Sequence, residues 1–257
     1  QDRMVHNPRT AMILTEQQLK FFDTFGFLHL PRFVTDSIDW IIEEFEAVFE
    51  RRTGNGDLVP HDGTQRTSVV PFIDQSEKLC TLLDHPHIHD LAASLLGEDF
   101  NYLAGDGHFY VGDTPWHSDG WNPEVLYIKI LFYLDALTTD SGCLRVLPGS
   151  HRIDDGYAKL LQESAGKNEA VFGLDGPDLP AVSVETEPGD IVVFNHNLKH
   201  ASFGGNARRR MFTMNLCQHC ETESELESLK QRIGKHARYL NDKMHSDAMR
   251  ETGPSER

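Results

Sequence analysis

The pattern of apolar and polar residues changes near residue 100. Before that point, apolar residues recur every three or four positions, which is the spacing of an amphipathic helix. After it, short runs rich in β-branched and aromatic residues are interrupted by Gly, Pro, Asp and Asn, which is typical of strands joined by turns. The sequence therefore predicts a mainly helical first part and a β-rich second part.

The most distinct helix is expected over residues 35–52. Its apolar positions repeat at helical spacing and are Ile38, Ile41, Ile42, Phe45, Val48 and Phe49. A first helix follows the capping box Thr15-Glu16-Gln17-Gln18 and ends at Gly26, before a strand over 27–30. Shorter helices are expected over 77–83 and 87–96.

The β-rich part predicts several short strands, as in a sandwich or barrel. They are expected over 102–111, 125–134, 143–147, 181–185, 190–195, 199–203 and 208–217. Residues 153–178 interrupt this pattern and are expected to be an insertion, part helix and part loop, over the mouth of a site. A second capping box at Thr222 predicts a C-terminal helix over 222–247.

Composition narrows the class of protein. The chain has 257 residues, of which 39% are hydrophobic and 25% charged, so we expect one elaborated domain over 1–257. In it, residues 1–100 form a helical support and 101–217 the β core. No apolar run approaches the roughly 18 residues of a membrane span, and the start of the chain does not resemble a signal peptide, so a cytoplasmic protein without membrane contact is expected.

The net charge of −16 gives a field that repels polyanions, so the expected partner is a small molecule and not nucleic acid. The four cysteines are irregularly spaced, and reduced thiols are expected. The pair Cys217 and Cys220 lacks the second pair that a structural zinc site needs. Nothing in the sequence indicates the oligomeric state.

Three residues are candidate metal ligands. His117 and Asp119 are two positions apart, so in extended chain their side chains share one face. His200 lies on a later predicted strand, and His196 is a nearby alternative. With 14 histidines in the chain, an H-x-D pair alone is weak evidence. Two imidazoles and one carboxylate are nevertheless the ligands that non-haem Fe(II) needs on one face.

A series of motifs surrounds these residues. It comprises W-H-S-D-G-W from Trp116, Y-I-K-I-L-F-Y-L-D-A-L from Tyr127, D-S-G-C-L-R-V-L-P-G-S-H from Asp140, P-G-D-I-V-V-F from Pro188 and H-A-S-F-G-G-N from His200. Over about residues 15–217 the chain resembles the phytanoyl-CoA dioxygenase family of Fe(II)/2-oxoglutarate oxygenases. The resemblance implies a mainly β fold with flanking helices, around a double-stranded β-helix of the jelly-roll, cupin-like type.

The resemblance also implies iron held by His117, Asp119 and His200. His200 is preferred to His196 because G-D-I-V-V-F resembles the family's strand before its distal histidine, and A-S follows His200. In the family an arginine about ten residues later binds the distal carboxylate of 2-oxoglutarate. Of three consecutive arginines, Arg209 fits this spacing best.

Strand alternation supports the choice of Arg209. It would place Arg209, Met211 and Thr213 on one face, with Arg208 and Arg210 on the other face towards solvent. A guanidinium fork can bind a carboxylate through two hydrogen bonds. Ser202 and Thr213 are expected to complete the co-substrate site.

The implied reaction consumes O2 and 2-oxoglutarate, releases succinate and CO2, and hydroxylates an aliphatic C–H bond of a small molecule. In related halogenases a small residue replaces the carboxylate ligand, so Asp119 favours hydroxylation. Desaturation or rearrangement, and the identity of the substrate, stay open. Four residues near the iron motif could line the substrate pocket: Tyr110, Trp121, Lys129 and Tyr133. Aromatic residues at such positions equally often pack in a core.

Two other functions are compatible with the same three ligands. Zinc with an open coordination position activates water, so a hydrolase is one alternative. A jelly-roll binding protein without catalytic activity is the other. Arg209 and the P-G-S-H segment favour the oxygenase over the hydrolase, and the intact set of ligands favours an enzyme over a binding protein.

Overall fold

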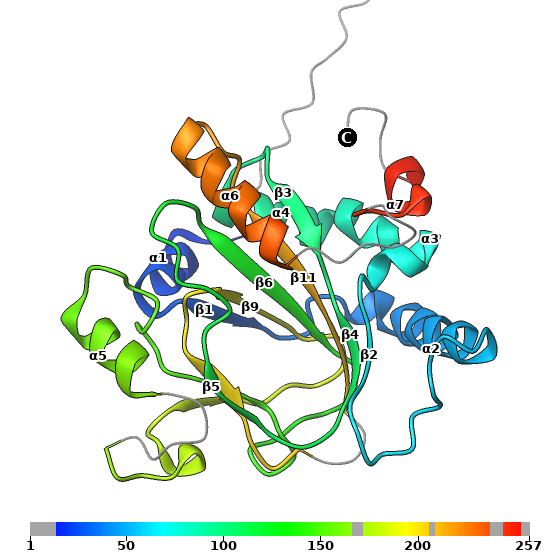
Figure 1. The fold of residues 1–257 in the computed structure, drawn as a ribbon, viewed down its shortest axis with the longest axis horizontal. Helices are drawn as coiled ribbons and strands as arrows, with labels where there is room; N and C mark the ends of the chain where they lie inside the picture. The colour runs from blue at the N-terminus through cyan, green and yellow to red at the C-terminus, as the bar shows by residue number, and fades with distance from the viewer. Residues whose placement is uncertain (1–13, 166–171, 206–208, 237–243, 253–257) are drawn as a thin grey trace, which may run out of the picture.

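The structure is a computed structural model that describes residues 14–165, 172–205, 209–236 and 244–252. Two antiparallel sheets face each other (Figure 1). The larger has the order β1-β9-β6-β11-β4-β2, with β3 also beside β11. Its strands are β1 Phe27–Leu30, β2 Thr67–Val69, β3 Asn101–Ala104, β4 Gly107–Tyr110, β6 Tyr127–Tyr133, β9 Ile191–Asn195 and β11 Arg209–Cys217. The smaller has the order β5-β10-β7-β8, with β5 Thr114–His117, β7 Leu144–Val146, β8 Val182–Val184 and β10 His200–Ser202.

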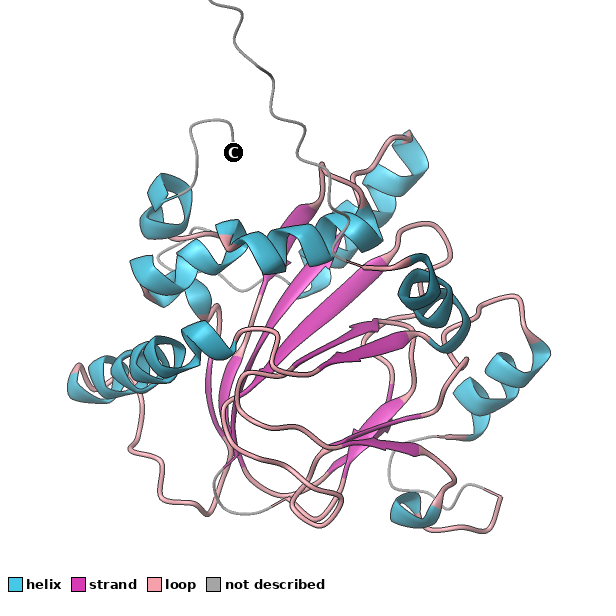
Figure 2. Ribbon diagram, turned by 180° about the vertical axis from the view of Figure 1, so that it is seen from behind, coloured by secondary structure: helices cyan, strands magenta, loops and turns pink. Residues whose placement is uncertain are grey.

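Helices of the first hundred residues cover the outer face of the larger sheet (Figure 2). They are α1 Glu16–Phe25, α2 Ile38–Gly54, α3 Glu77–Cys80 and α4 Pro86–Leu96, with short 3-10 turns at Thr35–Ser37, Ile73–Gln75 and Thr81–Asp84. Phe45 of α2 packs edge-on against Phe109 of β4, with 5.3 Å between ring centroids. Buried side chains of the helices and of the larger sheet form one cluster, so the two share a core. Each such buried side chain contributes about 1.5–3 kcal/mol to folding.

Strand alternation on β6 decides what faces the space between the sheets. Ile130 and Phe132 belong to the outer core under the helices, whereas Leu131 and Tyr133 pack in a second cluster between the sheets. Lys129 shares the inward face with these last two. A charged residue in an otherwise apolar strand is therefore directed into the interior of the double-stranded β-helix.

The fold class predicted from the sequence is confirmed, with local differences. The strand expected over 102–111 is two strands, β3 and β4, because Gly105 lies so close to β11 that a Cβ atom there would be 1.9 Å from the carbonyl oxygen of Thr213. The short strand β2 was not predicted. Asp119 lies beyond the end of β5 and is not in a strand.

The prediction of one continuous C-terminal helix over 222–247 is wrong. The structure has α6 Glu223–His236 and α7 Asp247–Thr252, and residues 244–246 between them are not helical. Ser246 begins the second helix, because its hydroxyl accepts a hydrogen bond from the amide of Met249. In the insertion, the structure has α5 Gly156–Ser164 and a 3-10 turn at Gly176–Asp178, while 166–171 lie outside the described residues. No helix within the described ranges has the length and apolar character needed to span a bilayer.

Candidate active site

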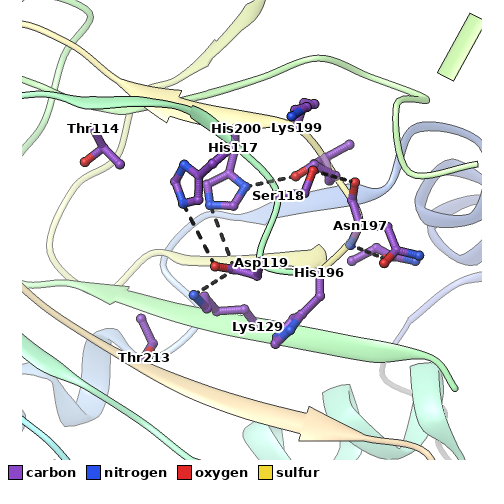
Figure 3. A network of polar contacts seen from close by, with 12 residues as sticks. Thr114, His117, Ser118, Asp119, Lys129, His196, Asn197, Lys199, His200 and Thr213 are labelled. Carbon is purple, nitrogen blue, oxygen red and sulfur yellow. Dashed lines mark hydrogen bonds and ion pairs between the residues drawn. The ribbon is translucent and has the colours of Figure 1, made fainter. Parts of the chain in front are cut away.

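The pairing of β5 with β10 brings two histidines together. His117 and His200 are direct partners across these antiparallel strands, so their side chains extend from the same face of the smaller sheet. Their ring centroids are 4.2 Å apart. Asp119, two residues beyond β5, reaches the same point (Figure 3). The strand register thus brings together two residues that are 83 positions apart in the sequence, 117 and 200.

Backbone carbonyl groups orient both imidazoles. Nδ1 of His117 lies 2.8 Å from the carbonyl oxygen of Pro115, and Nδ1 of His200 lies 2.9 Å from that of Leu198. A carbonyl oxygen can only accept, so each Nδ1 carries the proton and each Nε2 has a free lone pair. These Nε2 atoms lie 4.0 and 3.8 Å from the carboxylate oxygens of Asp119. This is the arrangement in which a histidine binds a metal.

The charge of Asp119 is balanced by Lys129, whose ammonium lies 2.7 Å from Oδ2. Burial alone would raise the pKa of Asp119, but the charge of the adjacent Lys129 lowers it far below its ordinary value. Burial also lowers the pKa of His200 to about 3. At neutral pH Asp119 is therefore an ionised carboxylate and Nε2 of His200 is unprotonated, as a metal requires.

Among the described residues, His117, Asp119 and His200 form the one group of three or more potential metal ligands, with all ligand atoms within 4.8 Å of one another. Two nitrogens and one oxygen on one side of a point fit Fe(II) and leave the remaining positions open. His196, the alternative to His200, is turned away: its Nδ1 lies 2.7 Å from Nη2 of Arg232. The donor set thus fits iron at the position expected from the sequence.

Arg209, the first residue of β11, is a buried cation whose described partners are all uncharged. Only 2% of the residue is exposed, and its guanidinium donates to the carbonyl oxygen of Gly142 and the hydroxyl of Ser202. Its Nε has no partner, and within the described chain no carboxylate lies within 4.0 Å. A buried cation with no carboxylate in contact is costly, so this pocket fits the distal carboxylate of 2-oxoglutarate.

A cavity of about 230 Å³ connects Arg209 with the three candidate ligands. Tyr110, Tyr133, Lys129, Ser202 and Thr213, which the sequence analysis named as candidates, also line it. The ring of Tyr110 lies beneath the guanidinium, with 4.5 Å from Arg209 Cζ to the ring centroid. Arg209, Met211 and Thr213 share the cavity face as alternation requires.

The other predicted residues lie elsewhere. Trp121 is 42% exposed and is not among the residues that line the cavity. Arg210 was expected in solvent, but it forms ion pairs with Asp135 and Glu46, because this face of β11 packs against α2 and the turn after β6. Arg208 lies outside the described residues.

Asp106 and His108 line the cavity and were missed in the sequence. Asp106 accepts a hydrogen bond of 2.6 Å from Thr213 and contacts the ring of His108, whose Nδ1 lies 2.7 Å from the hydroxyl of Ser68. Burial would raise the pKa of Asp106, but its contact with His108 and the charge of Lys129 lower it well below its ordinary value. The run G-D-G-H, which has small residues on both sides of a carboxylate within a predicted strand, was the available signal.

A double-stranded β-helix with two histidines, one aspartate and a buried arginine defines the class of Fe(II)/2-oxoglutarate-dependent dioxygenases. The family model of phytanoyl-CoA dioxygenase (PhyH) matches residues 22–211. The chain belongs to this family, as the motif series predicted, and is an iron- and 2-oxoglutarate-dependent oxidoreductase.

Relatives and solved structures agree with this assignment. The chain is 27% identical over 226 residues to a 2-aminoethylphosphonate dioxygenase of uncultured bacterium HF130_AEPn_1, covering 77% of this chain and 79% of the relative. It is 25% identical over 220 residues to the peroxisomal phytanoyl-CoA dioxygenase of Mus musculus, covering 74% of this chain and 64% of the mouse protein. The crystal structure of HygX from Streptomyces hygroscopicus, with nickel and 2-oxoglutarate bound, has the same fold, with a TM-score of 0.63, 20% identity, and coverage of 82% and 89% of the two chains.

Proposed function

We propose that this dioxygenase hydroxylates an aliphatic C–H bond of a small molecule, with His117, Asp119 and His200 as its iron ligands. The observation that carries the proposal is the convergence of these ligand atoms within 4.8 Å in a cavity that Arg209 also lines. The presence of a carboxylate at Asp119, and not a small residue, favours hydroxylation over halogenation. We further propose that the oxygenase is a single domain.

The side chains of the cavity divide the work. Arg209 binds the distal carboxylate of 2-oxoglutarate through its fork, and the hydroxyls of Ser202 and Thr213 complete that site. Leu131 and Leu144 form apolar walls of the cavity and limit the access of water to it. When bound, iron and 2-oxoglutarate supply the oxidising chemistry, in which O2 is consumed and succinate and CO2 are released.

The size of the cavity favours a small substrate. Its volume of about 230 Å³ is below the roughly 300 Å³ at which pockets for drug-sized ligands begin. Two relatives act on very different molecules by name, an aminoalkylphosphonate and a phytanoyl-CoA. Because 2-oxoglutarate would occupy part of this cavity, the space that remains favours a compact molecule of the first kind over a long acyl-CoA. We also propose an intracellular place of action, because all four cysteines are free thiols.

A screen of small metabolites scored by succinate release tests this function. The expected result is succinate formation that depends on iron and 2-oxoglutarate, with one oxygen atom added to the productive compound in its mass spectrum. Asp119→Ala should abolish both signals, because it removes one of three ligands. Hydrolysis supported by zinc, without succinate, would instead favour the hydrolase; tight binding without turnover would favour a binding protein.

A further inference from the structure

A second cavity of about 200 Å³ lies on the other side of the Asp119 and Lys129 pair. These two residues line both cavities, so the second one adjoins the proposed iron site. Its remaining polar lining comes from His196, Asn215 of β11 and Arg232 of α6. Leu103 and Ile233 supply apolar walls. The proposed binding of 2-oxoglutarate at Arg209 leaves this space unassigned.

Hydrogen-bond donors dominate the polar lining. Nη2 of Arg232 lies 2.7 Å from Nδ1 of His196, and because a guanidinium can only donate, Nδ1 must be the acceptor. The ring proton of His196 is therefore on Nε2. This residue is 2% exposed, and its Nε2 has no hydrogen-bond partner among the described residues. A buried donor without a partner costs about 1–3 kcal/mol, which a ligand oxygen would recover.

The charges of the second cavity are unbalanced once iron is bound. Lys129 and Arg232 are the two cations among its described lining residues. Asp119 is the one carboxylate among its described lining residues, and the metal would share that charge. An anion in the cavity would offset this local positive charge, although the net charge of the whole chain is −16.

Two contacts besides that with His196 fix Arg232 in place. Its guanidinium carbon lies 4.5 Å from the ring centroid of Tyr127, and its Nη1 lies 3.5 Å from the carbonyl oxygen of Asp119. Gly120 makes room for it, since a Cβ atom there would lie 2.8 Å from Nη1. A rigid, stacked guanidinium beside a cavity is suited to bind an oxyanion through its fork.

We propose that the second cavity binds an oxyanion group of the substrate, a carboxylate, phosphonate or sulfonate, through Arg232, Lys129 and His196. This inference rests on the proposed function and specifies its substrate class: a small molecule with an anionic group at one end and a short aliphatic part along Leu103 and Ile233. The shared wall at Asp119 and Lys129 then places the carbon to be oxidised beside the iron site.

Calorimetric titration of the anaerobic protein, loaded with Fe(II) and 2-oxoglutarate, tests this subsite. The probes are acetate, methylphosphonate and methanesulfonate, with acetamide as a neutral control. At least one oxyanion should bind and acetamide should not, and the preferred probe identifies the oxyanion. Arg232→Gln should weaken that binding at least about tenfold, the loss expected when one hydrogen bond to a charged group is removed.

Lys230→Gln is the matched control, because it removes the same charge from an exposed position of the same helix. It should change the affinity less than about twofold. Arg232→Lys keeps the charge but loses the fork, so it should retain part of the binding and shows that the site still folds. Equal weakening by Arg232→Gln and Lys230→Gln, or no oxyanion binding in the wild type, overturns the subsite.

The failure of the subsite can be distinguished from the failure of the proposed function. A visible charge-transfer band, recorded on the same samples before titration, shows whether 2-oxoglutarate has bound at iron. A normal band without oxyanion binding overturns the subsite alone. Absence of the band, with no succinate formed in air, overturns the proposed function, and the substrate role of the second cavity with it.

Discussion

The ammonium of Lys129 lies 2.7 Å from Oδ2 of Asp119, the carboxylate that we propose as an iron ligand. A lysine on the inward face of β6 thus occupies the position of a counter-ion at the metal site. Both side chains are mostly buried, with 15% and 17% exposed. Without metal, the pair leaves no uncompensated charge in the interior, and with metal the lysine becomes available to a ligand.

Lys129→Met should therefore act in opposite directions on stability and on metal binding. The metal-free variant should lose about 3 kcal/mol of unfolding free energy, because Asp119 becomes a buried charge without a counter-ion. A bound metal ion supplies the missing positive charge, so the loss of unfolding free energy should be much smaller in the metal-loaded protein. By thermodynamic linkage, the variant binds metal more tightly, by at least about tenfold. Urea unfolding with and without Ni(II) measures both; an equal loss in the two forms would contradict this role.

Two adjacent arginines on β11 should separate co-substrate binding from stability. Arg209→Gln should weaken 2-oxoglutarate binding by at least about tenfold, since a charged hydrogen bond contributes about 1.5–3 kcal/mol. Arg210→Gln breaks ion pairs with Asp135 and Glu46 on the opposite face, so it should lower stability and leave 2-oxoglutarate affinity unchanged. Titration with 2-oxoglutarate and urea unfolding of both variants measure the two effects. Equal loss of affinity would show that Arg209 is not the anchor.

The two neighbouring histidines should differ in metal binding. His200→Ala should lose stoichiometric Fe(II), because it removes a ligand nitrogen within 3.8 Å of Asp119. His196→Gln should retain the metal, because the ring nitrogens of His196 are not in the group of ligand atoms. Metal content after gel filtration checks both. Loss of iron in the second variant only would identify His196 as the ligand.

A buried carboxylate at the start of β9 gives a pH dependence to stability. Asp190 is 5% exposed and accepts hydrogen bonds from the amides of Arg32 and Glu187, with Nε2 of His29 at 2.9 Å. Burial would raise the pKa of Asp190, but these partners lower it below its ordinary value of 3.8. Its stabilisation is therefore fully present above about pH 4 and is lost as the pH falls through the lower pKa of the folded state.

Asp190→Asn should lower the unfolding free energy by about 2 kcal/mol at pH 7, the contribution of a hydrogen bond to a charged group. The difference from the wild type should shrink as the pH falls below about 4, where the wild-type carboxyl also becomes protonated. Asp36→Asn, at an exposed position, is the matched control and should have little effect. Urea unfolding over this pH range measures the difference; a constant difference would exclude the assigned pKa shift.

The helices and most strands could be predicted because their signals are local. The capping box at Thr15 and the stop at Gly26 are present as expected, and Gly26 has the positive φ of 85° that ends a helix. The break between β3 and β4 could not be predicted, because its cause is the close approach of Gly105 to a strand more than a hundred residues later. Non-local contacts of this kind leave little trace in one sequence.

In the candidate site, too, residues within local motifs could be predicted, and residues placed by non-local packing could not. The H-x-D motif and the arginine spacing could be recognised by resemblance to the family. The interior position of Lys129 was only one possibility, since alternation cannot tell which face of β6 lies between the sheets. Arg232 was not singled out at all, because a charged residue on a polar helix is usually in solvent, and only the packing of α6 brings it to His196.

The most direct test of the proposed active site is anaerobic addition of 2-oxoglutarate to the Fe(II)-loaded protein, followed in the visible spectrum. If His117, Asp119 and His200 hold iron and Arg209 holds the co-substrate, the wild type should develop a charge-transfer band that saturates with 2-oxoglutarate. Arg209→Gln should require far more of it, and His200→Ala should show no band. A wild type without this band, and without succinate after exposure to air, would contradict the proposed site.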